Sequence, residues 1–405
     1  MLYRIEIENF YSIRDAVSID LRAARNAPFS SHLQPVWPGA MERAPKVLAF
    51  FGANGSGKSN VLRAIVFLAW FTKESFQIGP DSPLPLVRFL DPEAAAAPTR
   101  LAVTFSGPSD PTSAQAANGP HCSYQYELVL GGAPGPVQVV TEALHYWPAG
   151  ASRKVRLFER HADPTKIEAV RAFGFSGYRV PVEKILRPNV SLISTLAQLR
   201  HPFALSLWNA ASTVFYNLMM EKYEFTDDDT IVRHYAKYPA LIDRLNRDIE
   251  RIDLGVRAMT VEDGANGPAA WFQHDGLTER LPMRLESHGT RMFVRTFPYV
   301  MQALETGGVA VVDELDNAIH PLVLPEIVRW FRDPERNALG AQLWMTCQNV
   351  SLLEELEKEE VWFCSKDRTG RTSVFGLADV KNVRRVDNFY RKYLSGIYGA
   401  VPLIG

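Results

Sequence analysis

The sequence predicts an α/β protein with a mixed central sheet, an antiparallel β lobe beside it and an inserted helical arm. Apolar runs without polar interruption are typical of strands that are covered on both faces of a parallel sheet. These runs are Val47–Phe51, Val309–Val312, Leu343–Thr346 and Val361–Cys364. Strand-like segments separated by Gly, Pro and Ser predict the antiparallel lobe. They are Leu101–Phe105, Ser123–Leu130 and Val137–Trp147.

The helical arm is predicted between about Val182 and Ile252, where the spacing of apolar residues becomes helical. Predicted strands lie on both sides of this segment, so we interpret it as an insertion into one head. At the start of the chain, Leu2–Ile7 and Val17–Leu21 alternate apolar and polar residues and predict an opening hairpin. We therefore expect an N-terminal lobe at residues 1–180, the arm at 181–255 and a C-terminal lobe at 256–405.

Composition limits the class of protein. The chain has 405 residues, 46% of them hydrophobic, which is enough for more than one compact unit. Its formal net charge of −1 excludes a global attraction to nucleic acid or to an anionic membrane, so any such contact must be local. Three cysteines without metal-type spacing, a start unlike a signal peptide and no membrane-length apolar run predict a cytoplasmic protein.

The segment Gly52–Ser59, GANGSGKS, fits the pattern G-x-x-x-x-G-K-[ST] throughout. A buried strand precedes it and helical spacing follows over Asn60–Thr72, which is the context that a phosphate-binding loop needs. Backbone N–H groups of such a loop surround a β-phosphate, Lys58 reaches the β- and γ-oxygens, and the Ser59 hydroxyl reaches Mg²⁺. We therefore predict that ATP binds here with Mg²⁺. The expected nucleotide contacts are Asn54, Gly55, Ser56, Gly57, Lys58, Ser59 and Asn60.

Asp313 and Glu314 directly follow the apolar run Val309–Val312. A buried strand that ends in Asp presents a second magnesium contact in phosphate-loop proteins, and an adjacent Glu can orient or deprotonate the attacking water. Apolar residues followed by two carboxylates are a weak signal alone, since many strands end in acidic loops. Together with an intact phosphate loop they predict ATP hydrolysis, with Ser59 and Asp313 at the metal and Glu314 as the general base.

A small-residue motif precedes that strand by one predicted helix. Glu286-Ser287-His288-Gly289-Thr290 opens the helical residues 291–303 and resembles the signature motif of ABC-type ATPases. The resemblance implies that this segment of one protomer closes over the γ-phosphate held by the other, with Ser287 and Gly289 as nucleotide contacts. The alternative is an ordinary Ser/Gly helix cap.

Two further segments fall at positions typical of that family. Residues Asp316–Pro321 resemble its dimer-contacting loop, with His320 where transporters usually carry Asp. Gln348, after the run Leu343–Thr346, occupies the place where relatives typically have a histidine that touches the γ-phosphate. Glutamine can hydrogen-bond a phosphate or a water but cannot titrate. Gln348 is therefore the expected γ-phosphate sensor, and the rate of hydrolysis is left open.

The whole chain resembles the RloA-like (AbiL-type) proteins and the ATPase portions of OLD-family nucleases, with RecF and the SMC heads as more distant relatives. The resemblance is carried by the opening Ile5–Phe10, by Asn54, by the motif at Ser287–Thr290, by Asp313–Pro321 and by the tail. The tail segments are Val361–Asp367 and Tyr393–Pro402. The resemblance implies a phosphate-loop NTPase of ABC type that forms a homodimer or higher homo-oligomer, head-to-tail around ATP. It also implies anti-phage defence with a separate effector, a nuclease or a toxin.

Two other functions stay open. A RecF- or SMC-like ATPase would use ATP-driven closure to clamp DNA, and a nucleotide-gated scaffold would turn ATP over little. The basic cluster within Lys381–Tyr393, with its interleaved aromatic residues, could meet nucleic acid. Asp379 and Asp387 dilute its charge, which favours a solvated face or a surface for a protein partner.

Overall fold

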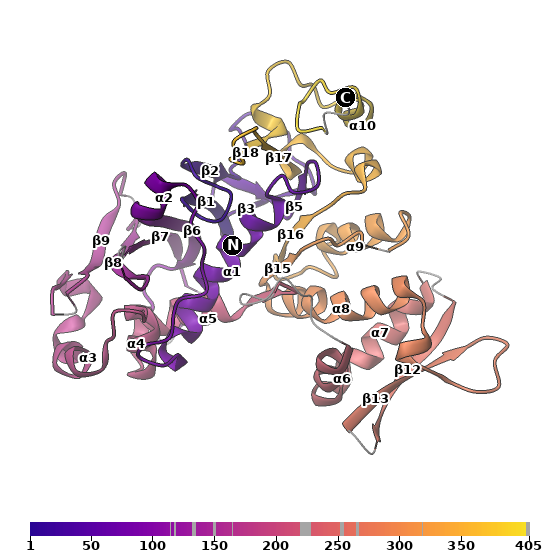
Figure 1. Cartoon of the computed structure of the whole chain (residues 1–405), viewed down its shortest axis with the longest axis horizontal. Helices are drawn as coiled ribbons and strands as arrows, with labels where there is room; N and C mark the ends of the chain where they lie inside the picture. The colour runs from indigo at the N-terminus through magenta and orange to yellow at the C-terminus, as the bar shows by residue number, and fades with distance from the viewer. Residues whose placement is uncertain are drawn as a thin grey trace.

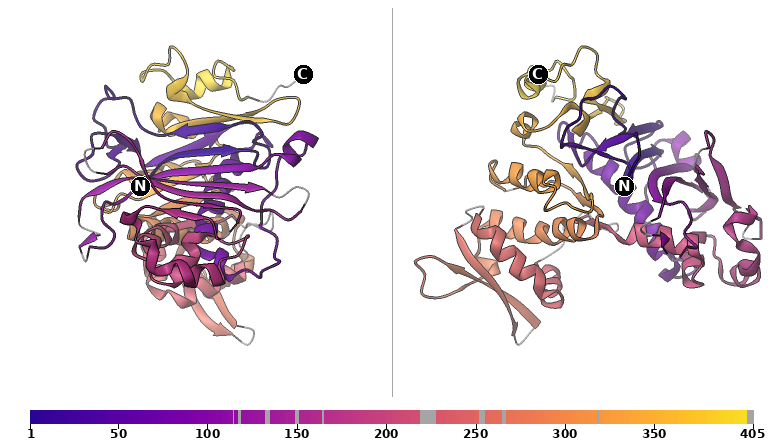
Figure 2. Two further views of the ribbon diagram at one scale, coloured as in Figure 1. Left: turned by 90° about the vertical axis from the view of Figure 1, so that its left-hand side faces the viewer. Right: turned by 180° about the vertical axis from the view of Figure 1, so that it is seen from behind.

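The computed structural model describes residues 1–113, 115–116, 119–131, 135–148, 151–163, 165–218, 228–251, 255–264, 267–317 and 319–401. Two large sheets form the body of the molecule, and a smaller lobe of helices and strands projects from it (Figure 1). Figure 2 shows the antiparallel sheet and this smaller lobe at opposite ends of the molecule. The predicted α/β class, with a mixed central sheet and an antiparallel lobe, is confirmed.

The central sheet has the strand order β11-β15-β16-β5-β17-β18. The bounds are β5 Val47–Phe51, β11 Val214–Tyr216, β15 Val309–Val312, β16 Gln342–Thr346, β17 Val361–Lys366 and β18 Thr372–Gly376. All neighbouring pairs are parallel except β17 and β18, which are antiparallel. The apolar runs therefore predicted four of these strands correctly. The order places β16 between β5 and β15, the two strands that lead into the phosphate loop and the acidic pair.

Alternate residues of the central strands face two separate cores, which explains their unbroken apolar runs. In β5, Leu48 and Phe50 belong to one core and Ala49 to the other. Helix α1 covers the first face, while α8 and α9 cover the second. Their bounds are α1 Lys58–Glu74, α8 His288–Thr306 and α9 Val323–Arg332. Because α1 begins at Lys58, the end of the predicted phosphate loop already has helical backbone.

A seven-stranded antiparallel sheet stands beside the central sheet, in the order β10-β9-β8-β7-β6-β1-β2. The bounds are β1 Leu2–Glu8, β2 Val17–Asp20, β6 Thr99–Pro108, β7 His121–Gly131, β8 Gln138–Tyr146, β9 Val155–His161 and β10 Ile167–Ala169. The predicted opening hairpin and the three predicted lobe strands are confirmed, and β9 and β10 extend the sheet. The turn after β1 reaches the central sheet, because the Ser12 carbonyl accepts a hydrogen bond from Thr372 N at 2.8 Å.

The segment predicted to be helical is divided by a strand. Helices α3, α4 and α5 precede β11, and α6 and α7 follow it. Their bounds are α3 Arg179–Ile185, α4 Leu192–Gln198, α5 Pro202–Ser212, α6 Asp228–Lys237 and α7 Pro239–Arg251. The expectation of a purely helical segment is wrong at Val214–Tyr216, which pairs with β15. Three residues are too few to show a strand period in sequence. The domain boundaries at 180/181 and 255/256 stay a prediction.

The smaller lobe ends in a three-stranded sheet beside α6 and α7 (Figure 1). Its strands are β12 Val256–Gly264, β13 Gly267–His274 and β14 Leu281–Pro282. The remaining short elements are β3 Leu33–Pro35, β4 Arg43–Pro45, α2 Pro92–Ala96 and α10 Phe389–Leu394. Among the residues that the structure describes, no helix combines the length and the apolar character that a membrane crossing requires.

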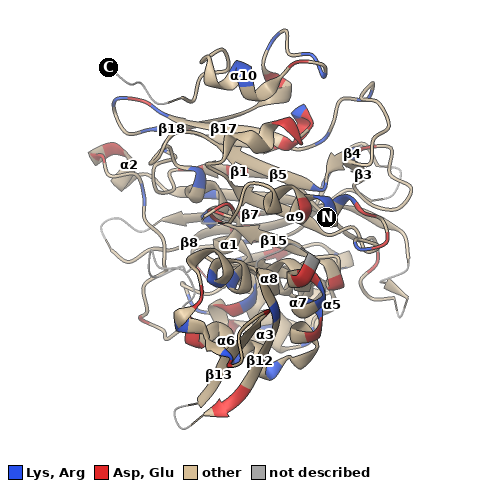
Figure 3. Cartoon of the chain, turned by 90° about the vertical axis from the view of Figure 1, so that its right-hand side faces the viewer, with Lys and Arg blue, Asp and Glu red and all other residues tan. Residues whose placement is uncertain are grey.

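Charged residues of both signs lie close together around α10 (Figure 3). Arg385 pairs with Glu357 at 2.6 Å and with Glu359 at 2.5 Å. Lys392 pairs with Asp387 at 2.7 Å. Part of the charge of the basic cluster is therefore neutralised within the chain, which adds to the sequence argument against a nucleic-acid surface there.

Candidate functional site

A cleft of about 670 Å³ opens at the carboxyl ends of β5 and β16, above the start of α1. Every residue from Asn54 to Asn60 lines it, together with Glu314, Thr346 and Gln348. In parallel α/β sheets, ligands bind at this edge. The structure thus brings the phosphate loop, the acidic pair after β15 and the end of β16 to one place.

Two glycines of the loop occupy positions that exclude a side chain. A Cβ on Gly52 would lie 2.1 Å from the carbonyl oxygen of Cys364. A Cβ on Gly57, whose φ is 100°, would lie 2.2 Å from Thr372 Oγ1. The loop therefore packs directly on β17 and β18, and glycine is required by close approach as well as by backbone conformation.

Lys58 and Ser56 give the loop its cation and a free hydroxyl. The Lys58 ammonium donates to the carbonyl of Gly52 at 2.8 Å and to that of Ala53 at 3.1 Å. Burial lowers the pKa of Lys58, and the start of α1 adds partial positive charge beside it. Ser56 Oγ is buried and has no hydrogen-bond partner among the described residues. Both groups suit an anionic ligand with several oxygen acceptors.

Asp313 binds two hydroxyl groups through one carboxylate oxygen. Its Oδ1 accepts from Ser59 Oγ at 2.9 Å and from Thr346 Oγ1 at 2.6 Å. The Asn217 side chain fixes the backbone of Asp313, because it accepts a hydrogen bond from Asp313 N at 2.8 Å and donates one to Asp313 O at 2.9 Å. Carboxylate and hydroxyl oxygens are the ligands that Mg²⁺ prefers, so Ser59 and Asp313 fit the predicted ion.

Glu314 is held at the mouth of the cleft in a left-handed backbone conformation, with φ of 50°. Its N–H donates to Thr346 Oγ1 at 2.7 Å. Gln348 Nε2 donates to its Oε1 at 3.3 Å, and Asn317 Nδ2 donates to its Oε2 at 3.5 Å. Burial, and then the neighbouring carboxylate of Asp313, raise the pKa of Glu314. A carboxylate that is more basic than usual accepts a proton more readily.

The predicted signature residues do not line this cleft. Ser287 is exposed and caps α8, with its Oγ accepting from Thr290 N at 3.1 Å. Gly289 lies half-buried in the first turn of the same helix. An ordinary helix cap has the same geometry. Contact of Ser287 and Gly289 with a nucleotide held by a second copy therefore stays a prediction.

One side of the cleft was not predicted from the sequence. Its residues are Tyr11, Ser12, Arg63, Val87, Arg88, Phe89, Leu90, Lys366 and Thr369. The Arg63 guanidinium stacks on the Tyr11 ring at 5.5 Å from its centroid, which offers a flat surface of the kind that nucleobases prefer. Within the printed sequence, the turn around Tyr11 indicates only a hairpin. Its left-handed backbone, with φ of 50° at Tyr11, becomes evident only in the structure.

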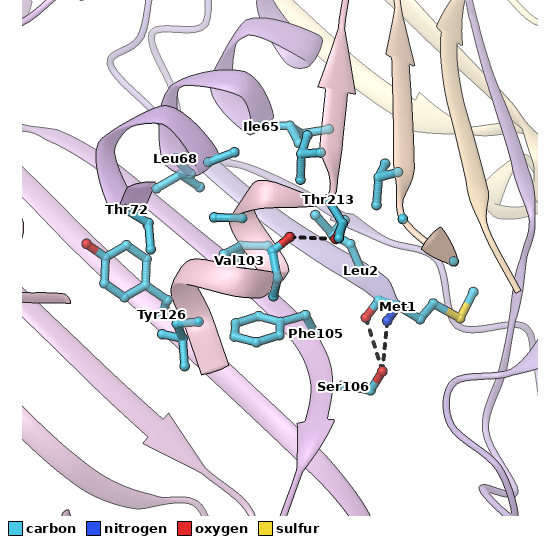
Figure 4. Close-up of a pocket in the computed structure, with 18 residues that line it drawn as sticks. Met1, Leu2, Ile65, Leu68, Thr72, Val103, Phe105, Ser106, Tyr126 and Thr213 are labelled. Atoms are coloured by element: carbon cyan, nitrogen blue, oxygen red, sulfur yellow. Dashed lines mark hydrogen bonds between the residues drawn. The ribbon is translucent and has the colours of Figure 1, made fainter. Parts of the chain in front are cut away.

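A second cavity lies away from the loop, between the far half of α1, α5 and β6 (Figure 4). It measures about 120 Å³, and its lining includes Ile65, Leu68, Val103 and Phe105. No charged side chain lines it. Small-molecule sites usually measure about 300–1,000 Å³, so a cavity of about 120 Å³ does not suit the predicted nucleotide.

Comparison with known proteins gives a family and several similar folds. A family model described as "AAA domain, putative AbiEii toxin, Type IV TA system" matches residues 47–130 and 184–354. An SMC head solved in complex with the C-winged helix domain of ScpA is 12% identical, with a TM-score of 0.47, and the match covers 93% of this chain and 97% of that one. The SMC head domain from Thermotoga maritima is 14% identical, with a TM-score of 0.40 and coverage of 93% and 98%.

A third similar structure is the Smc head domain from Pyrococcus furiosus with an extended coiled coil, bound to the C-terminal domain of ScpA. It is 12% identical, with a TM-score of 0.43 and coverage of 93% and 96%. No curated protein matches the sequence. The family model covers more than half of the chain and includes the phosphate loop, Asp313, Glu314 and Gln348. The chain therefore belongs to the AAA-domain family of AbiEii toxin-like proteins, which have a phosphate-loop NTPase fold.

Proposed function

We propose that this chain is an ABC-type ATPase that binds ATP with Mg²⁺ in the cleft at the phosphate loop and hydrolyses it. One observation carries the proposal: Ser59 and Asp313 share a hydrogen bond of 2.9 Å while Glu314 and Gln348 line the same cleft. An anion-binding loop, oxygen ligands for a metal and a general base are the parts that phosphoryl transfer to water requires.

Each group has a distinct task in this mechanism. The loop N–H groups and the Lys58 ammonium bind the β- and γ-phosphate oxygens and withdraw charge from them. Ser59 and Asp313 would hold Mg²⁺, which would supply positive charge next to those oxygens. Glu314 orients a water molecule and accepts its proton. Gln348 donates to Glu314 and lies where its amide can also contact the terminal phosphate or the water.

We further propose that two copies pair head-to-tail, so that Ser287 and Gly289 of one contact the nucleotide held by the other. The exposed start of α8 offers backbone N–H groups to an anion. Leu285, just before this motif, is 59% exposed, and Leu322, just after the segment Asp316–Pro321, is 75% exposed. Large apolar side chains at both predicted contact segments favour burial against a second copy. Ala318 of that segment lies outside the described residues.

A Glu314→Gln variant tests hydrolysis and pairing together. The amide keeps the shape of the side chain but cannot accept a proton, so we expect hydrolysis to fall by about 100-fold or more while ATP binding persists. Phosphate release and light scattering with ATP would measure turnover and pairing. Glu279→Gln is the matched control, since Glu279 is exposed and lies outside the cleft. Unchanged hydrolysis in Glu314→Gln would overturn the assigned base, and a monomer with bound ATP would overturn the pairing.

The biological role we propose is that of a sensor or regulator in anti-phage defence, with a separate nuclease or toxin as effector. The toxin–antitoxin description of the family and the RloA-like motifs support it. Affinity purification of the Glu314→Gln protein with ATP from its native host would test the role. Recovery of a nuclease or toxin supports defence. Recovery of recombination proteins, or duplex DNA binding that depends on ATP, would favour a clamp of RecF type instead.

A further inference from the structure

The hairpin of β17 and β18 forms one wall of the cleft. Lys366, the last residue of β17, and Thr369, in the turn, both line the cleft. Strand β17 is the parallel neighbour of β5 on the side away from β16. Glu314 and Gln348 therefore line the cleft from the β16 side of the phosphate loop, and Lys366 lines it from the opposite side.

Hydrogen bonds fix this hairpin to the phosphate loop. Thr372 Oγ1 donates to the Ser56 carbonyl at 2.8 Å. The Thr372 and Ser12 hydroxyls lie 2.7 Å apart, and Asn60 Nδ2 donates to Ser12 Oγ at 2.7 Å. Gly57 packs so closely on Thr372 that no Cβ fits between them. The end of β17 is therefore held at a constant position relative to any ligand of the loop.

The neighbouring carboxylate does not neutralise Lys366. Asp367 Oδ1 accepts from Thr369 N at 2.8 Å, from Thr369 Oγ1 at 2.7 Å and from Arg371 N at 2.9 Å. These bonds orient the Asp367 carboxylate toward the turn of the hairpin to which it belongs. Within the part of the chain that the structure describes, no carboxylate lies within ion-pair distance of the Lys366 ammonium.

Each of the other cations of the cleft makes at least one hydrogen bond to a protein group. Lys58 donates to two loop carbonyls, and Arg63 stacks on Tyr11 and donates to Asn60 Oδ1 at 3.2 Å. Arg88 donates to the Ala95 carbonyl through Nη1 at 3.2 Å, while its buried Nε and Nη2 have no hydrogen-bond partner among the described residues. Lys366 pairs across the hairpin with Thr372, whose hydroxyl lies 2.7 Å from that of Ser12, the residue after Tyr11. Lys366 therefore adds a positive charge on the Tyr11 side of the cleft, where the base has a surface to stack on.

We propose that Lys366 binds the α-phosphate of the nucleotide and so acts as a second phosphate-binding lysine, complementary to Lys58. The proposal rests on the proposed function, because it places the terminal phosphate beside Glu314 and Ser59. A triphosphate that enters the loop with its γ-phosphate there extends its α-phosphate and sugar toward Tyr11 and Lys366. A lysine is a point charge that binds phosphate oxygens without strict geometry, so a rigid hairpin is a suitable support for it.

Equilibrium binding to purified full-length variants tests the proposal. In Lys366→Met we expect ATP and ADP to bind more weakly by the same factor, about ten- to a hundred-fold, since one charge-assisted hydrogen bond is lost from both. Lys366→Arg should keep most of the affinity. Arg368→Met is the matched control, because Arg368 is exposed on the same hairpin but does not line the cleft. Thermal unfolding without nucleotide should be unchanged in all three variants.

Sulfur substitution at the α-phosphate locates the contact. The two ATPαS diastereomers should bind wild type with different affinities, and Lys366→Met should not distinguish them. If Lys366→Met loses affinity for ATP but not for ADP, Lys366 contacts the γ-phosphate instead. If Lys366→Met and wild type bind both nucleotides equally, Lys366 makes no contact with the nucleotide. Either result overturns the inference while the proposed function stands. Absence of ATP binding that depends on Lys58 would instead overturn the proposed function.

Discussion

Thr346 connects the Asp313 carboxylate to the backbone of Glu314, and replacing it with valine isolates that connection. Its Oγ1 donates to Asp313 Oδ1 at 2.6 Å and accepts from Glu314 N at 2.7 Å. The side chain is 1% exposed, so water cannot replace either bond. Thr346→Val keeps the shape of the side chain but leaves the Glu314 N–H without a partner, which costs about 1–3 kcal/mol. It also removes the hydrogen bond to the charged Asp313 carboxylate, which costs about 1.5–3 kcal/mol.

We expect Thr346→Val to lower the free energy of unfolding by about 2–4 kcal/mol, because Ser59 still satisfies Asp313 in part. If poorer orientation of the reacting groups also raises the activation free energy by about 2 kcal/mol, hydrolysis slows by about 30-fold. Nucleotide affinity should change little, since the phosphate loop is untouched. Urea unfolding and steady-state phosphate release measure the two effects. Thr346→Ser keeps the hydroxyl and is the control; equal stability and turnover in Thr346→Val and wild type would refute the reasoning.

Two further substitutions test the loop and the smaller lobe. Gly57→Ala should weaken ATP binding by more than about ten-fold, since its Cβ would lie 2.2 Å from Thr372 Oγ1. Gly55→Ala has open space around its Cβ and should cost less, so equal losses in a binding assay would contradict the packing argument. His274 hydrogen-bonds the Glu286 carboxylate at 2.5 Å, and this bond raises its pKa. The stability that this bond adds is therefore fully present below 6.5, the pKa of His274 in the unfolded chain. It is lost as the pH rises through the higher pKa of His274 in the folded protein. Urea unfolding of His274→Gln should show a deficit of about 1 kcal/mol or less at about pH 5.5 and a smaller one at about pH 8.5; a deficit independent of pH would count against the ion pair.

Features encoded in consecutive residues were predictable from the sequence. The phosphate loop Gly52–Ser59 is one such feature, because its glycines, lysine and serine are adjacent in the chain. The strands β5, β15, β16 and β17 are another, because a strand covered on both faces must be apolar at every position. The position of Asp313 and Glu314 directly after β15 follows from the same pattern.

Strand β11 was missed for a physical reason. Its three residues, Val214–Tyr216, are each only half-buried, and they join the central sheet solely by pairing with β15. So short a segment carries no period of its own, and helical spacing on both sides outweighs it. Asn217, which follows β11, is consequently brought beside Asp313 by a strand that no local pattern indicates.

The sequence by itself determined that this protein has a phosphate loop on a mixed α/β sheet, with an acidic pair after a second buried strand. Only the tertiary structure decided which side chains meet there. Thr346 bonds Asp313, and Lys366 lines the wall opposite Glu314, because β16 and β17 flank β5 in the sheet. The physical reason is that strand order depends on how the helices and the second sheet pack across both faces. That packing sums many distant contacts, none of which a local stretch of sequence contains.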